Sequence, residues 1–161
     1  VSHLRANYSE RLEVGYRWYH THGVKPAYAF GHGLSYTSFT YAVLSKEEEE
    51  PPGQTEGGGR ERVVATIDFT LTNTGSRAGA EVAQLYTSFP ASAGEPPVQL
   101  RNFTKIQLAA GASVRISFEV SERDLSVWDV EAGAWALVHG AHQLAVGAAS
   151  DDLRQHVTVH A

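Results

Sequence analysis

The stretch that decides the fold is residues 62–72, which read RVVATIDFTLT. Apolar residues occupy every second position from 63 to 71, and mostly polar residues fill the positions between them. In an extended chain successive side chains point to opposite faces, so this period of two is typical of a β-strand with one buried and one wet face. Asn73-Thr74-Gly75 then closes the strand as a turn.

Similar short strands follow along the chain, and turn residues separate them. The expected strands lie near residues 37–45, 62–72, 80–88, 98–108, 114–120, 134–138, 143–148 and 156–160. A short helical turn is expected at residues 121–124, capped by Ser121. No alternating helical pattern accompanies the strands, so the sequence predicts an all-β sandwich of about seven strands. Trp128 and Trp135 are expected in its core or against its end.

Residues 1–36 have a different character, because they show no sustained period and combine aromatic residues with glycines and a proline. An irregular, aromatic-rich segment needs a surface to cover. We therefore expect an extended arm over residues 1–36 that packs on another body, and a sandwich over residues 37–161. The alternative is that the aromatics only cover this domain's own core. The candidate interface residues are Tyr16, Arg17, Trp18, Tyr19, Phe30, His32 and Tyr36.

Residues 46–61 carry a lysine, a run of four glutamates, two prolines and several glycines. Like charges repel one another, and this composition offers almost no apolar surface to bury, so a disordered acidic, Gly- and Pro-rich loop is expected. A calcium site is not expected there, because consecutive carboxylates in an extended loop do not converge on one ion.

Composition excludes several classes of function. The net charge of −5 argues against nucleic acid as a partner, because nucleic-acid binders usually carry a basic patch. No apolar run approaches membrane-spanning length, and the first residues do not form a signal peptide. The chain has no cysteine and no methionine, and it begins with Val1. We therefore expect it to be a piece of a longer protein.

One segment resembles a known family junction. Residues 27–39 read AYAFGHGLSYTSF. They resemble the FGHGLSYT segment that, in glycoside hydrolase family 3, links the catalytic body to a C-terminal fibronectin type III-like domain. Ala29 and Asn102 depart from the family, which often has Pro and Gly at these positions. Further blocks resemble the family in the same order: residues 81–86 (EVAQLY), 100–106 (LRNFTKI), 124–129 (DLSVWD) and 146–154 (VGAASDDLR).

The resemblance implies an immunoglobulin-like, fibronectin type III-like sandwich that stabilises the catalytic domains and their seam. Its partners would be the catalytic barrel and the α/β sandwich domain of a parent O-glycosyl hydrolase of the β-glucosidase or β-xylosidase type. The parent would be secreted, extracellular or periplasmic. The family's catalytic Asp and Glu precede this junction, so no catalytic residue and no cofactor are expected in the chain. The alternative is a carbohydrate- or cell-wall-binding interaction module without hydrolase activity, which could hold polysaccharide through exposed aromatics.

Other candidate sites are weaker. His20, His22 and His32 lack the spacing of metal ligands, so no metal is expected. Asp124 and Asp129 are expected to bond local backbone rather than to form a catalytic pair. Residues 31–33 (GHG) follow no parallel strand, so they do not predict a dinucleotide site. Asn7 and Asn102 begin N-glycosylation sequons, and Asn102 must face outward to be modified.

Overall fold

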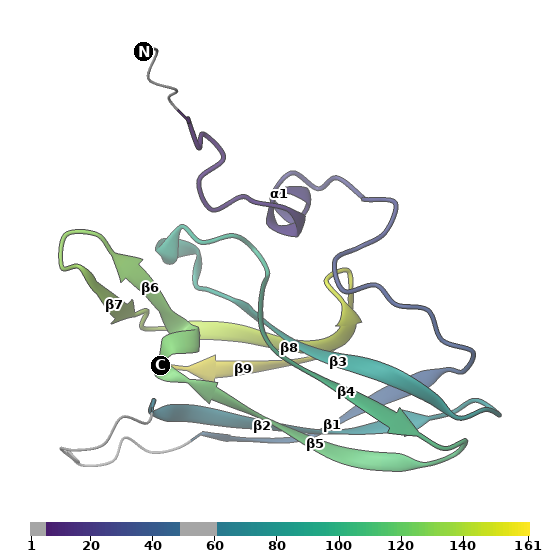
Figure 1. Cartoon of the computed structure of the whole chain (residues 1–161). Helices are drawn as coiled ribbons and strands as arrows, with labels where there is room; N and C mark the ends of the chain where they lie inside the picture. Colours follow the sequence, from purple (N-terminus) through teal and green to yellow (C-terminus); the bar gives the residue numbers. More distant parts are fainter. Residues whose placement is uncertain (1–5, 49–60) are drawn as a thin grey trace.

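The chain forms two antiparallel sheets and a separate hairpin in the computed structural model, which describes residues 6–48 and 61–161 (Figure 1). The strands are β1 (Phe39–Glu48), β2 (Val63–Asn73), β3 (Gly79–Ser88), β4 (Gln99–Leu108), β5 (Ser113–Ser121), β6 (Ser126–Asp129), β7 (Ala134–Leu137), β8 (Ala141–Ala149) and β9 (Asp152–His160). The described residues also form three short helices: α1 (Tyr16–Thr21), which precedes the strands, and η1 (Ala91–Ala93) and η2 (Glu122–Leu125), which lie between strands. One sheet has the order β1-β2-β5, the other has the order β4-β3-β8-β9, and β6 pairs with β7 alone. These seven sheet strands confirm the predicted all-β sandwich.

The core lies between the two sheets, and β2 supplies its centre. Ile67, Phe69 and Leu71 are at most 1% exposed, so the apolar alternation of residues 62–72 is confirmed. Leu85 of β3 and Leu144 of β8 fill the core from the facing sheet. Tertiary packing of these rows, rather than strand propensity alone, holds the sandwich together.

Asp68 lies on the face of β2 that the sequence pattern predicts to be exposed to solvent, yet it is only 4% exposed. Arg115 of β5 donates a hydrogen bond to its carboxylate at 2.6 Å, and the Ser117 hydroxyl donates another. These two hydrogen bonds, that from Arg115 first, hold the pKa of Asp68 below its usual value. The outer face of this sheet is therefore organised by a charge network that alternation alone does not reveal.

The prediction that Trp128 and Trp135 lie in the core or against its end is wrong. They sit opposite each other on the β6–β7 hairpin, where they are 50% and 45% exposed. The core takes smaller apolar side chains and a few phenylalanines and tyrosines instead. The helical turn capped by Ser121 is confirmed, because Ser121 and Asp124 form a reciprocal capping box at the start of η2.

Two further features differ from the expectations. The arm is not wholly irregular, because it contains the six-residue helix α1. Strand β1 continues to Glu48, and Lys46 pairs there with Ile67. Residues 49–60 of the expected acidic loop lie outside the described residues, as does the second half of the glutamate run that was weighed as a calcium site.

His142 of β8 is fully buried, and this makes stability depend on pH. Its Nε2 lies 2.7 Å from the Val138 carbonyl oxygen, while its Nδ1 has no hydrogen-bond partner. Burial lowers the pKa of the imidazole and the charge of Arg101 adds to this, while the hydrogen bond to the Val138 carbonyl opposes it.

Lower pH should therefore destabilise the sandwich through His142. The unfolded imidazole takes up a proton near pH 6.5, above the lowered pKa of the folded one, so this stability is complete above about pH 7 and is lost as pH falls. Urea unfolding at pH 7.5 and pH 5.5 should show a smaller pH dependence for His142→Phe than for the wild type. Identical pH dependence in both proteins would contradict this assignment.

Candidate domain interface

The arm lies over the outer face of the four-stranded sheet (Figure 1), and it buries the middle of β3 from that side. Ala83 and Leu85 of β3 point into the core. Gln84 and Tyr86 point to the opposite face, yet they are only 3% and 1% exposed. A strand that is buried on both faces needs a cover on each, and the arm is the cover on the outer face.

Tyr16 anchors α1 to the sandwich. Its hydroxyl accepts a hydrogen bond from the Leu100 backbone N–H at 2.8 Å. Its ring stacks on Phe30, with centroids 4.5 Å apart and planes 14° apart, and meets the Tyr86 ring edge-on at 6.3 Å. Such aromatic contacts add to the effect of area burial, so Tyr16 fixes the side of α1 that faces the sheet.

A second anchor lies at Gly31. The Gln84 amide donates to the Gly31 carbonyl at 3.2 Å and also to the Ala148 carbonyl. Tyr86 donates its hydroxyl proton to the Gln84 Oε1 at 2.6 Å. Burial raises the pKa of Tyr86, so the hydroxyl stays protonated and remains a donor. The Ser150 N–H completes the junction by donating to the Phe30 carbonyl at 2.9 Å.

Other side chains of the arm remain partly or largely exposed. Trp18 and Tyr19 are 38% and 39% exposed, and Tyr36 is 93% exposed. Trp18 stacks on His22 at 4.4 Å rather than on the sandwich. Large apolar side chains gathered on one segment are more typical of an interaction surface than of a free one.

The sequence-predicted interface residues therefore divide into two groups. Tyr16 packs against this domain's own sheet, which fits the alternative that the aromatics cover their own core. Phe30 does so in part, because it stacks on Tyr16 while remaining 46% exposed. Arg17 is half-buried, and its guanidinium lies 6.0 Å from the Tyr16 ring centre. The outward group consists of Trp18, Tyr19, His32 and Tyr36.

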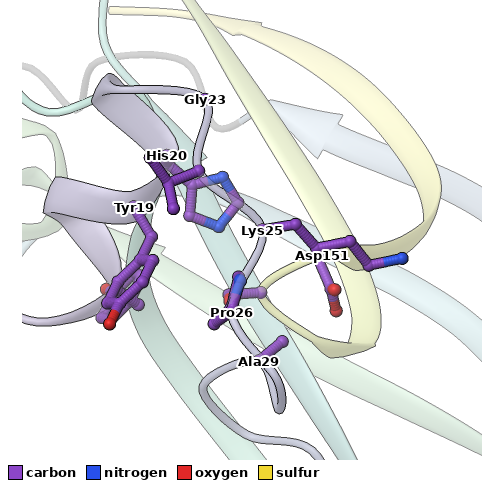
Figure 2. A pocket seen from close by; sticks show the side chains of 10 residues that line it. Tyr19, His20, Gly23, Lys25, Pro26, Ala29 and Asp151 are labelled. Atoms are coloured by element: carbon purple, nitrogen blue, oxygen red, sulfur yellow. The ribbon is translucent and has the colours of Figure 1, made fainter.

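A pocket of about 350 Å³ lies between α1, the segment that follows it and the β8–β9 turn (Figure 2). Tyr19 and His20 line it from α1, Lys25 and Pro26 from the following segment, and Asp151 from the turn. The wall combines an aromatic ring with one positive and one negative side chain. Such a hollow beside the exposed Tyr19 is suited to receive a side chain from a docked body.

The other candidate residues are not brought together. His22 lies 2.9 Å from the Trp18 carbonyl oxygen through its Nδ1, and His32 lies against the Tyr28 ring. Asp124 caps η2, and Asp129 accepts hydrogen bonds from two backbone N–H groups of its own turn. Within residues 6–48 and 61–161, no three His, Cys, Asp or Glu side chains are grouped as a metal site would need.

The two sequons differ in their surroundings. Asn7 is exposed in the arm. Asn102 is paired across β3–β4 with the core residue Leu85, and cross-strand partners share a face of the sheet. Asn102 is therefore half-buried on the inward side of an edge strand and does not face outward.

Sequence reasoning missed Gln84 and Tyr86, which form the floor under the arm. A signal existed, because residues 83–87 form an uninterrupted buried run in β3 and a strand covered on both faces often lacks clear alternation. The sequence could not show that a polar Gln would be buried, since its partners come from the arm and from β8.

No described helix is long and apolar enough to cross a membrane.

Comparison with known proteins identifies the fold and the region. The fibronectin type III-like domain family matches residues 81–150. Probable β-glucosidase D of Aspergillus niger is 39% identical over 158 residues, which are 93% of this chain and 21% of that protein. The chain thus spans about a fifth of the length of the relatives it matches.

Two solved β-glucosidases have the same structure over this region. The enzyme D2-BGL of Chaetomella raphigera superposes with a TM-score of 0.87 at 38% identity, covering 96% of this chain and 23% of that one. The β-D-glucoside glucohydrolase of Trichoderma reesei superposes with a TM-score of 0.86 at 35% identity, covering 99% and 24%. Over nearly its whole length the chain is therefore similar to a C-terminal part of family 3 β-glucosidases that contains a fibronectin type III-like domain.

Proposed function

We propose that this chain is the non-catalytic C-terminal part of a longer β-glucosidase, in which residues 1–36 dock on the preceding catalytic domains and residues 37–161 support them. The observation that carries the proposal is the two-sided character of α1. Tyr16 is hydrogen-bonded to Leu100 and meets the Tyr86 ring edge-on, while Trp18 and Tyr19 of the same helix remain 38% and 39% exposed. A helix held on one side and aromatic on the other is suited to bridge two bodies.

Energetics support a covered arm. Burying one large aromatic side chain stabilises a protein by about 2–3 kcal/mol relative to leaving it in water. The arm leaves Trp18, Tyr19 and Tyr36 partly or largely in water. Relatives about five times as long as this chain provide a body that could cover these side chains.

The acids of the chain support a non-catalytic role. Hydrolysis with retention requires two carboxyl groups about 5–5.5 Å apart, one of them with a raised pKa. Asp152 is held by Arg154 at 2.6 Å, and this hydrogen bond lowers its pKa. Burial does raise the pKa of Glu81, but its carboxylate accepts a hydrogen bond from the Tyr41 hydroxyl at 2.9 Å. We therefore assign the chemistry of the parent O-glycosyl hydrolase, and its sugar substrate, to the preceding domains.

Polysaccharide binding is the weaker candidate. The exposed rings of Trp128 and Trp135 are inclined at 64° and do not form a flat row. Stacking on sugar rings favours a coplanar platform, so this geometry does not favour the binding-module alternative. A secreted, extracellular or periplasmic location belongs to the same proposal.

Trp18→Ala tests the docking of the arm. In the longer protein the substitution should lower the free energy of unfolding by about 2–3 kcal/mol, because a buried indole is lost from an interface. In the 161-residue chain the loss should stay within about 0.5 kcal/mol, as for other surface substitutions. Arg17→Ala should show the same direction. Thermal unfolding of both proteins measures the difference.

Glu119→Ala is the control, because Glu119 is exposed on β5, in the sheet that does not carry the arm. It should cost little in either protein. Equal losses for Trp18→Ala in the longer protein and in the isolated chain would show that the arm only completes the sandwich.

A further inference from the structure

All three tryptophans of the chain are partly exposed, and they lie at two places on the surface. Trp18 belongs to α1, while Trp128 and Trp135 belong to the β6–β7 hairpin. Figure 1 shows both elements outside the two sheets. The proposed docking of the arm accounts for the exposed ring of Trp18. It does not account for the exposed rings of Trp128 and Trp135 on the hairpin.

The hairpin pair forms a compact cluster with an arginine. Trp128 and Trp135 face each other across the two strands, with ring centres 5.5 Å apart. The guanidinium of Arg123, in η2, lies 3.3 Å from the centre of the Trp135 ring. Val130, at the turn beside Trp128, is 84% exposed. Tryptophan and arginine are the residues most enriched at the energetic centres of protein interfaces.

We propose that the hairpin surface, formed by Arg123, Trp128, Val130 and Trp135, is a second docking surface for the preceding domains of the same protein. This proposal rests on the proposed function. The first reason to choose these domains as the binding partner is the length of the relatives. The chain accounts for only 21% of the length of its Aspergillus niger relative, and the remainder is large enough to reach both α1 and the hairpin.

The second reason to choose these domains is that the hairpin surface and the arm are connected along the sandwich. Arg101 of β4 follows Leu100, whose N–H donates to the Tyr16 hydroxyl of α1 at 2.8 Å. Burial lowers the pKa of Arg101, the carboxylate of Asp124 in η2 opposes this, and the guanidinium of Arg17 in α1 adds to it. Arg101 is therefore within electrostatic reach of both the helix that carries Trp18 and the turn that precedes the hairpin. Figure 1 shows α1 above the four-stranded sheet and the hairpin beyond the end of β8 opposite the β8–β9 turn, so one body seated on α1 reaches the hairpin by extending along the sheet.

The pair offers less to a sugar. Arg123 covers one face of Trp135, and the 64° inclination leaves no common plane with Trp128. A protein surface can enclose both ring edges and the methyl groups of Val130, whereas a sugar ring needs one free, flat face.

Hydroxyl-radical footprinting of the longer protein and of the 161-residue chain tests the proposal. At equal radical dose, oxidation of Trp128 and Trp135 should be several-fold slower in the longer protein than in the 161-residue chain, where they are 50% and 45% exposed. Trp18 reports separately on the arm. A third sample, the 161-residue chain with soluble cello-oligosaccharide, tests for a sugar at the hairpin.

The outcomes separate the two proposals. Protection of Trp18, Trp128 and Trp135 in the longer protein supports both. Protection of Trp18 alone overturns the hairpin surface and leaves the proposed function standing, while equal oxidation of all three in both proteins overturns both. Protection of Trp128 by cello-oligosaccharide, without protection in the longer protein, overturns the hairpin proposal in favour of a sugar site. As a second measure, Trp128→Ala should lower the thermal midpoint of the longer protein more than that of the chain.

Discussion

Replacing Gly31 by alanine is expected to release the arm from the sandwich. Gly31 has a φ of +82°, and a Cβ atom there would lie 2.1 Å from the Gln84 Oε1. Gln84 cannot move aside freely, because it is buried and its amide is hydrogen-bonded to the Gly31 and Ala148 carbonyls. The left-handed backbone costs alanine about 1–2 kcal/mol, and disturbing a buried hydrogen-bond network costs about 1–3 kcal/mol more.

The expected result for Gly31→Ala is therefore a loss of about 2–5 kcal/mol in the free energy of docking the arm. Amide hydrogen exchange of α1 measures it, because helix amides exchange faster when the arm leaves the sheet. Gly33→Ala is the matched control in the same motif, since a Cβ at Gly33 meets nothing within 4 Å. If both substitutions accelerate the hydrogen exchange of α1 equally, Gly31 does not hold the arm on the sandwich.

Replacing Asn73 by alanine is expected to destabilise the whole sandwich. Asn73 ends β2, is fully buried and joins three segments. Its Oδ1 accepts hydrogen bonds from the Thr37 hydroxyl at 2.6 Å and from the Gly75 N–H at 3.1 Å. Its Nδ2 donates to the Arg77 carbonyl at 2.7 Å and to the Leu108 carbonyl at 3.2 Å.

Asn73→Ala leaves several of these partners without a hydrogen bond, and each buried unsatisfied group costs about 1–3 kcal/mol. A loss of about 3–4 kcal/mol in the free energy of unfolding is expected by urea denaturation. Thr74→Ala is the control, because Thr74 is exposed and its hydroxyl makes one bond, to the Ser38 carbonyl at 3.2 Å. Losses of similar size for the two variants would contradict the role of Asn73.

The strands could be predicted from the sequence where one face is buried and the other is wet. This holds for β2 and β5, whose inward residues Phe69 and Phe118 alternate with polar ones. Asn73 was recognised only as a turn residue, because its partners at Thr37 and Leu108 are 36 and 35 positions away. Contacts between distant segments leave no local pattern in a single sequence.

The candidate interface could be predicted only in part. The aromatic content of residues 1–36 indicated an interface element, but α1 spans six residues, too few for a helical period to show. The split between Tyr16 and Trp18 depends on how the helix is rotated on the sheet. The exposure of Trp128 and Trp135 was missed because large aromatics usually indicate a core, and only the pairing of β6 with β7 outside both sheets separates them from it.

The most direct measurement is hydrolysis of nitrophenyl β-glucoside by three proteins: the longer protein, its upstream part without this chain, and the 161-residue chain alone. The chain alone should show no turnover above buffer, since the two carboxylates of the reaction are assigned to the preceding domains. The longer protein should be active, and the upstream part should lose its activity at a lower temperature. Turnover by the purified chain that disappears when one of its own Asp or Glu residues is replaced would contradict the assignment of this chain as a non-catalytic support.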